Sequence, residues 1–130
     1  MQIHQSAEDY LETILMLTQR MGRVRSIDVV NELGYTKASV SIAMKKLREN
    51  GYIAVDGEGN LTLLAPGREI AERIYSRHRL LTHFFMQLGV DEKIAAEDAC
   101  KAEHILSEET LAKIREQALL HDAEESAKNG

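Results

Sequence analysis

Several residue types are scarce in this chain of 130 residues, and each scarcity narrows the possible folds and functions. The single cysteine excludes an internal disulfide and fits a reducing compartment. One proline and eight glycines, beside abundant leucine, alanine, glutamate and lysine, favour helices. No apolar run approaches the roughly 18 residues of a membrane span. Residues 1–6 have neither a basic start nor an apolar stretch, so we expect no signal peptide and a cytoplasmic location.

Charge is unevenly distributed along the chain. The net charge of −5 is unusual for a nucleic-acid binder. Residues 20–48, however, hold seven basic and two acidic side chains, whereas residues 85–130 hold five basic and eleven acidic ones. A basic N-terminal half can meet phosphates, and an acidic C-terminal half can hold cations.

The order of predicted elements indicates a mainly α fold. Apolar periodicity and capping residues predict helices over 6–20, 27–33 and 37–49, with Gly34 ending the second and Thr36 capping the third. Two β-prone runs, 52–55 and 61–64, flank a glycine-rich turn and predict a hairpin. Further helices are predicted over 67–88, from Asp91 to about 106, and from Ser107 to about 120, with a fraying tail. We therefore expect an N-terminal winged helix-turn-helix domain over 1–65 and an α-helical metal-binding and dimerisation domain over 66–130.

A DNA-reading surface is predicted on the second helix of the helix-turn-helix. The turn over 34–36 has the expected length, and the helix that follows it should enter the major groove with its N-terminus first. Hydroxyl and ammonium groups suit contacts to phosphates and base edges. The predicted DNA-binding residues are Ser26, which also can cap its helix, Thr36, Lys37, Ser39, Ser41, Lys45 and Lys46. The wing tip, 57–60, is not basic and is expected to make at most a weak contact.

A simpler interpretation of the basic residues is a solvated helix on any small helical protein. The ordered succession of cap, turn, helix and hairpin favours DNA binding over that interpretation, because a motif gains weight from its predicted context.

Candidate metal ligands occur in three separate segments. Cys100, Glu103 and His104 have the i, i+3, i+4 spacing that places side chains on one face of a helix. A thiol, a carboxylate and an imidazole together suit a divalent transition metal. Asp9 and Glu12 are three residues apart on the first predicted helix. If these segments meet at His78 in the long helix, they could surround one or two cations.

Each candidate ligand also has an ordinary structural interpretation. Cys100 alone is more often a small buried apolar residue, and Asp9 alone would be an acid that complements a helix dipole. His78 alone would be a surface or capping histidine. The coincidence of all these residues with a ligand pattern favours the metal site, although the sequence does not show that the three segments meet.

Several motifs resemble the diphtheria-toxin-repressor family of metal-dependent transcriptional regulators, and within it the branch of manganese transport regulators. The motifs cover nearly the whole chain: 7–12 (AEDYLE), 36–41 (TKASVS), 47–52 (LRENGY), 77–81 (RHRLL), 88–91 (LGVD) and 97–107 (EDACKAEHILS). The resemblance implies a homodimer that binds a palindromic operator of double-stranded DNA near metal-uptake genes, with the metal as co-repressor.

The same resemblance implies a ligand set. The ligand positions of the manganese branch fall on Asp9, Glu12, His78, Glu103 and His104. The sixth position, usually glutamate, is Cys100 here, which is similar to the iron-responsive branch; that branch usually has methionine in place of Asp9. The expected cofactor is therefore Mn²⁺, with Fe²⁺, Zn²⁺ or Co²⁺ as alternatives. The dimer surface is expected among apolar residues of the last two helices: Ile94, Ile105, Leu106, Leu111, Ile114 and Leu119.

Two competing functions remain open at this stage. The first is a winged-helix regulator that ignores metal. The second is a helical-bundle enzyme with a carboxylate-histidine metal centre. The chain lacks paired Glu-x-x-His repeats and a second acid-base set, so we expect no catalysis, no small-molecule substrate and no membrane partner.

Overall fold

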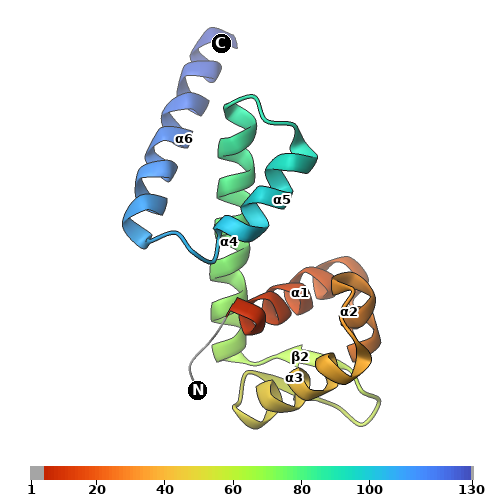
Figure 1. Cartoon of the computed structure of the whole chain (residues 1–130). Helices are drawn as coiled ribbons and strands as arrows, with labels where there is room; N and C mark the ends of the chain where they lie inside the picture. Colours follow the sequence, from red (N-terminus) through yellow and green to blue (C-terminus); the bar gives the residue numbers. More distant parts are fainter. Residues whose placement is uncertain (1–4, 130) are drawn as a thin grey trace. The chain divides into compact units, whose positions relative to one another are not determined.

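The computed structural model describes residues 5–129 and is mainly α-helical, as predicted. Six helices and one two-stranded hairpin are observed (Figure 1): α1 (Gln5–Met21), α2 (Ser26–Leu33), α3 (Lys37–Glu49), β1 (Ile53–Val55), β2 (Leu61–Leu63), α4 (Ala65–Gln87), α5 (Glu92–Ala102) and α6 (Glu108–Asn129). The expectation that the chain has no signal peptide depends on residues 1–6. Of these, residues 1–4 lie outside the described residues. Within 5–129, no helix combines the length and the apolarity needed to cross a membrane.

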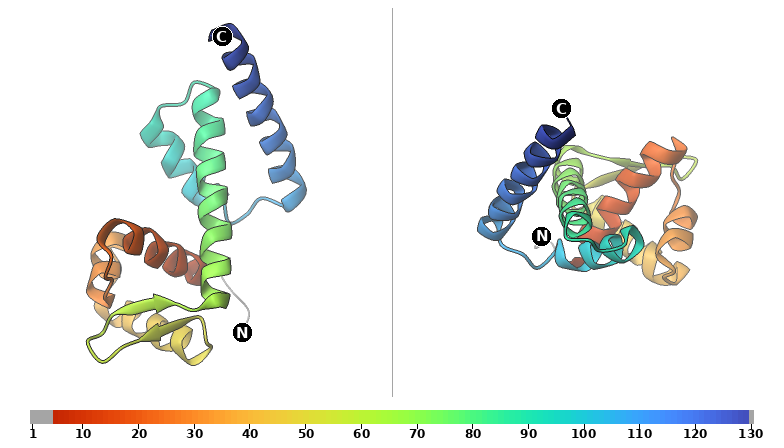
Figure 2. Two further views of the ribbon diagram at one scale, coloured as in Figure 1. Left: turned by 180° about the vertical axis from the view of Figure 1, so that it is seen from behind. Right: turned by 90° about the horizontal axis from the view of Figure 1, so that it is seen from above.

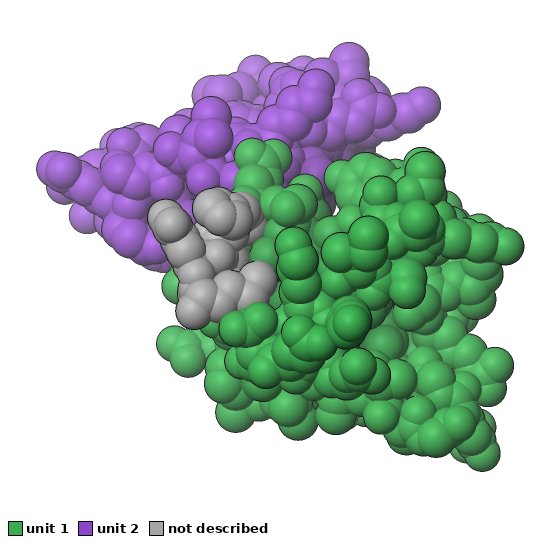
Figure 3. Space-filling view, turned by 60° about the horizontal axis from the view of Figure 1, so that its bottom comes forward, with its two compact units in different colours: residues 1–73 green, residues 74–130 purple. Residues whose placement is uncertain are grey.

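The chain forms two compact units, Met1–Arg73 and Ile74–Gly130 (Figure 3). The domain boundary predicted after residue 65 lies at the start of α4, whereas the units divide inside this helix. The first turns of α4 belong to the N-terminal unit because they pack on it. Directly before α4, Leu64 N donates to the carbonyl of Tyr52 at 3.0 Å; within the helix, Ala71 is fully buried and Arg73 lies 3.6 Å from the carboxylate of Glu8.

The N-terminal unit is a winged helix-turn-helix. Helix α1 packs against α2, α3 and β2, and α2 packs against α3. Strands β1 and β2 are antiparallel, with Ile53 paired to Leu63 (Figure 2). The core is built from one apolar face of each element: Leu11, Ile14, Leu17, Val29, Val40, Met44, Leu47, Ile53, Leu61 and Leu63. This core fixes the position of α3 within the unit.

Local capping sets the ends of α2 and α3. Gly34 adopts a left-handed conformation (φ 72°) and ends α2, and Thr36 Oγ1 accepts a hydrogen bond from Ser39 N at 3.1 Å, as predicted. The prediction that Ser26 caps α2 is wrong. Arg25 is the N-cap residue, because Asp28, in the first turn, accepts a hydrogen bond from Arg25 N at 2.9 Å and starts the helix one residue earlier.

The tip of the wing is organised around the carboxylate of Asp56. Its oxygens accept hydrogen bonds from the backbone N–H groups of Glu58 and Asn60 at 2.9 Å, and from Asn60 Nδ2 at 3.0 Å. These bonds, the Asn60 backbone bond first, hold the pKa of Asp56 below its usual value. The carboxylate of Asp56 therefore stabilises the turn itself. Together with Glu58 it makes the tip of the wing acidic.

The C-terminal unit consists of the second part of α4, α5 and α6. Its core contains Leu81, Ala99 and Leu111, with partly buried apolar neighbours Leu80, Phe85, Ala102, Leu106 and Ile114. Leu111 thus belongs to the core of the subunit and is not available for the dimer surface predicted for it.

Helices α5 and α6 end at residues other than those predicted. Helix α5 ends at Ala102, not near 106, because hydrogen bonding tightens there: Ile105 N donates to the carbonyl of Ala102 at 3.1 Å. This turn lets Leu106 pack on the core. Helix α6 continues to Asn129, where a fraying tail was predicted. Its last ten residues are rich in alanine and glutamate, which favour helix.

Gly67→Ala is expected to destabilise the N-terminal unit by about 2 kcal/mol, although alanine is the better helix former by about 1 kcal/mol. A Cβ atom at Gly67 would lie 2.2 Å from the backbone carbonyl oxygen of Tyr52, which cannot rotate away. Chemical denaturation of both variants measures the effect. The matched control is Gly57→Ala, where no atom lies within 4 Å of the new Cβ. Equal stability of the two variants would contradict the close packing of α4 on the wing.

Candidate metal centre and DNA-binding surface

Two of the predicted ligands, Asp9 and Glu12, lie on α1 in the N-terminal unit. The side chain of Glu12 is buried and that of Asp9 is half-buried. Tyr10 lies between these two acids on α1 and is also buried. Burial raises the pKa of its hydroxyl group, and the charges of Tyr35 and Asp9 add to the increase. A buried carboxylate requires hydrogen bonds, an opposite charge or a metal ion to offset its lost hydration. Glu12 is therefore not a solvated surface charge, whereas Asp9 keeps access to solvent, and the ligand role of both stays a prediction.

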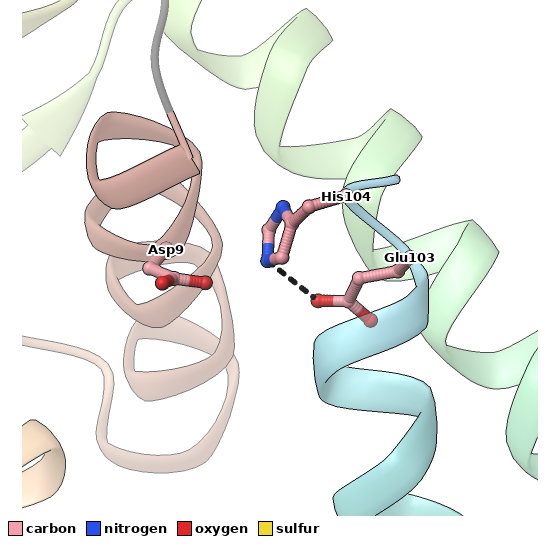
Figure 4. A group of neighbouring side chains, drawn as sticks. All are labelled: Asp9, Glu103 and His104. Carbon is pink, nitrogen blue, oxygen red and sulfur yellow. Dashed lines mark ion pairs between the residues drawn. The ribbon is translucent and has the colours of Figure 1, made fainter. Parts of the chain in front are cut away.

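Three more predicted ligands come together within the C-terminal unit around Glu103. This residue caps α5 at its C-terminal end, and its side chain is fully buried. Its Oε2 atom lies 2.9 Å from Nδ1 of His78, and its Oε1 atom lies 3.5 Å from Nε2 of His104. Figure 4 shows the Glu103–His104 pair, with Asp9 drawn on its own helix. Among residues 5–129, no hydrogen-bond donor reaches Glu103 Oε1.

The donor set fits a divalent cation. A hydrogen bond from His78 Nδ1 to the carboxylate places the proton on that nitrogen and leaves the lone pair of Nε2 for a metal, the arrangement common among metal-binding histidines. Glu103 Oε1 and His104 Nε2 are 3.5 Å apart, and two ligands about 2.1 Å from one ion are separated by roughly 3 to 3.5 Å. A cation also supplies the positive charge that a buried carboxylate needs.

Cys100 differs in environment from the other predicted ligands of this segment. Its side chain is exposed, whereas Glu103 is buried. The prediction that Cys100, Glu103 and His104 lie on one helix is wrong for His104, because α5 ends at Ala102, Glu103 is its C-terminal cap, and His104 lies in the following turn. A ligand role for Cys100 stays a prediction. His83, which is not among the predicted ligands, pairs with Asp122 of α6 at 3.0 Å.

Arg77 holds the turn that carries Glu103 and His104, and sequence reasoning did not single it out. Its Nη1 donates to the backbone carbonyl of Glu103 at 3.1 Å, and its Nη2 pairs with Glu108 at the start of α6. The guanidinium therefore ties α4 to both ends of this turn. Its position directly before His78, a predicted ligand, was the only feature of the sequence that could have pointed to it.

The exposed face of α3 carries most of the predicted DNA-binding residues. The side chains of Lys37, Ser39, Ser41, Lys45 and Lys46 are exposed, and Lys45 Nζ lies 4.0 Å from a carboxylate oxygen of Glu49. Thr36 is exposed but serves first as the cap of the helix. Ser26 is half-buried at the start of α2. The prediction missed Ile42, which is 58% exposed in the middle of this face.

Comparison with known protein families gives two matches, one for each half of the chain. Residues 2–61 match the family described as the iron dependent repressor, N-terminal DNA binding domain. Residues 65–124 match the iron dependent repressor, metal binding and dimerisation domain. The two descriptions cover the wing-bearing half and the half that contains His78, Glu103 and His104.

Individual relatives are similar over most of the chain. An uncharacterized HTH-type transcriptional regulator of Methanocaldococcus jannaschii is 35% identical over 113 residues, which are 85% of this chain and 90% of that protein. The HTH-type transcriptional regulator MntR of Bacillus velezensis is 32% identical over 123 residues, 95% of this chain and 87% of that protein. A solved manganese-dependent transcriptional repressor in complex with manganese superposes with a TM-score of 0.79 at 28% identity, over 86% of this chain and 52% of that chain. The chain spans about half the length of this structure and of the solved manganese regulator SloR.

Proposed function

Since this chain belongs to the iron-dependent repressor family, we propose that it is a transcriptional repressor activated by a divalent metal, and that the metal is manganese. The membership confirms the resemblance found in the sequence motifs. The observation that carries the proposal is the buried carboxylate of Glu103 between the imidazoles of His78 and His104. The manganese-dependent repressor among the solved structures supports the choice of metal.

Asp9, Glu12, His78, Glu103 and His104 are the proposed metal ligands. Hard oxygen and imidazole nitrogen donors suit manganese or ferrous iron, whereas a thiolate shifts preference toward iron, cobalt or zinc. The five proposed ligands are all oxygen or nitrogen donors, so manganese is favoured, and Cys100, whose side chain is exposed, stays a predicted sixth ligand.

A metal that takes ligands from both units couples them. Asp9 and Glu12 belong to the DNA-binding unit, and the other three ligands belong to the dimerisation unit. An ion that binds ligands of both units favours the conformations in which these ligands are close together. It increases the affinity for DNA only to the extent that DNA binds the same conformations more tightly. The proposed complex is a homodimer bound to a palindromic operator near metal-uptake genes. The proposed location of the protein is the cytoplasm, and we expect no catalytic activity. Ile94, Ile105 and Leu119, all exposed, are the proposed apolar contacts of the dimer.

The experiment that tests this function begins with duplexes selected by the protein from a random pool in the presence of manganese. Fluorescence anisotropy then compares binding of the best duplex with chelator, manganese, ferrous iron, zinc and cobalt at fixed salt. We expect affinity in manganese to exceed affinity in chelator by at least about 100-fold, within the range of allosteric coupling energies. Equal binding with chelator would favour the metal-independent winged-helix regulator, and a ranking led by iron or zinc would overturn the choice of metal.

Lys46→Gln is expected to weaken DNA binding for all sequences alike. The exposed ammonium of Lys46 lies on α3, where it can meet a phosphate and release a condensed counterion. The slope of log K against log salt should become shallower by about one unit. Lys113→Gln, on α6 of the other unit, is the matched control and should leave the slope unchanged. A loss confined to one duplex sequence would contradict a phosphate contact.

A further inference from the structure

Ile42 occupies the outermost position of α3. The buried residues Val40, Met44 and Leu47 mark the inner face of this helix. Ile42 follows Val40 by two residues, a rotation of about 200° around the helix, so it points almost directly away from the core. Its 58% exposure agrees with this position.

The surroundings of Ile42 are polar and basic. Ser39 precedes it by three residues, and Lys45 and Lys46 follow by three and four, the spacings that bring side chains together on a helix. Ala38, one turn earlier, is also exposed. Single exposed apolar side chains are common on protein surfaces. This one, however, stands in the centre of a surface whose other groups are hydroxyls and ammonium ions suited to DNA.

Only one chemical group in the major groove matches an apolar side chain. Each base pair presents hydrogen-bond donors and acceptors there, and thymine alone adds a methyl group at C5. The lysines around Ile42 complement the negative charge of the phosphates on either side of the groove. An isoleucine between them gains by covering a thymine methyl, which removes apolar surface of both groups from water.

We propose that Ile42 selects thymine at fixed positions of the operator by contact with its C5 methyl group. This rests on the proposed function of the protein, and it adds a determinant of sequence specificity to a helix whose other exposed groups mainly serve phosphates or hydrogen bonds. The expected preference is for A·T pairs at the base steps that the middle of α3 faces.

The test replaces thymine by deoxyuridine, one position at a time, in a duplex selected by the wild-type protein with manganese. This substitution removes the methyl group and leaves every hydrogen-bonding group in place. Wild-type affinity, measured by anisotropy, should fall about fourfold at each contacted position. Ile42→Ser should bind thymine and deoxyuridine duplexes alike, because the group that contacts the methyl is gone. Ile42→Val should keep part of the difference.

Met21→Ala is the matched control, since Met21 is an exposed apolar residue of the same unit at the end of α1. It should keep the full discrimination between thymine and deoxyuridine. The proposal is overturned if the wild-type protein binds all the substituted duplexes equally, or if Ile42→Ser keeps the discrimination. A change in dimerisation by Ile42→Ser, without a change in DNA affinity, would also overturn it. If no duplex is selected with any metal, the proposed function itself fails, so the two failures are distinguishable.

Discussion

Glu103→Gln is expected to lower the affinity for manganese by about 100-fold or more and to abolish the stimulation of DNA binding by metal. Even partners that only orient metal ligands contribute 10- to 100-fold to metal affinity, and Glu103 is proposed both to bind the ion and to orient His78. The amide oxygen of glutamine can still accept the hydrogen bond from His78, so the fold should be kept. The substitution removes the negative charge and replaces the other oxygen, which faces His104, by an amide NH2 group that does not bind metal.

Two measurements separate these effects. Electron paramagnetic resonance of free manganese gives the metal affinity, and thermal unfolding of the metal-free protein gives its stability. Glu97→Gln is the control, because Glu97 is an exposed carboxylate on the same helix, α5. It should bind manganese as the wild type does. Unchanged metal affinity in Glu103→Gln would place the metal site elsewhere.

Asp9→Met is expected to move the metal response from manganese toward ferrous iron. The substitution replaces a hard, charged oxygen donor by a soft, neutral thioether, which favours iron over manganese. We expect manganese affinity to fall at least about tenfold, as for other changes at the ligand shell. DNA binding in ferrous iron should persist, because the four other proposed ligands remain.

The matched variant is Asp9→Glu, which keeps a carboxylate and should keep the preference for manganese. Anisotropy titrations with each metal, performed without oxygen for ferrous iron, give the two rankings. An identical ranking of metals for Asp9→Met and the wild type would show that Asp9 does not contact the ion. Loss of DNA binding in every metal would instead show that Asp9 stabilises α1 itself.

Much of the N-terminal unit could be predicted because its signals are local. The bounds of α3 follow from Thr36, whose side chain caps it, and from the apolar spacing of Val40, Met44 and Leu47. The hairpin follows from a turn built on Asp56. The cap of α2 was placed incorrectly at Ser26, and its start one residue too late, because Asp28, three residues after the observed cap Arg25, accepts the bond from Arg25 N that fixes the cap.

The site in the C-terminal unit was harder to predict because long-range packing shapes it. The end of α5 depends on Leu106 packing near Leu81 and Leu111, which no local signal reveals. Glu103 and His104 were named as ligands on the premise of a continuous helix, yet they lie in a turn that Arg77 of α4 holds. Ile42 was missed because only hydroxyl and ammonium groups were considered as contacts to DNA.

One metal ion is proposed to link the ligands of both units to DNA binding, and thermodynamic reciprocity allows this linkage to be measured. If manganese strengthens DNA binding, DNA must strengthen manganese binding by the same factor. Manganese affinity would be measured by paramagnetic resonance with the selected duplex and with a scrambled duplex of the same composition. We predict an affinity at least about 100-fold higher with the selected duplex, the same factor that is expected for the effect of manganese on DNA binding. Equal affinities with both duplexes would rule out this linkage, because the metal would then bind without regard to the DNA-binding state.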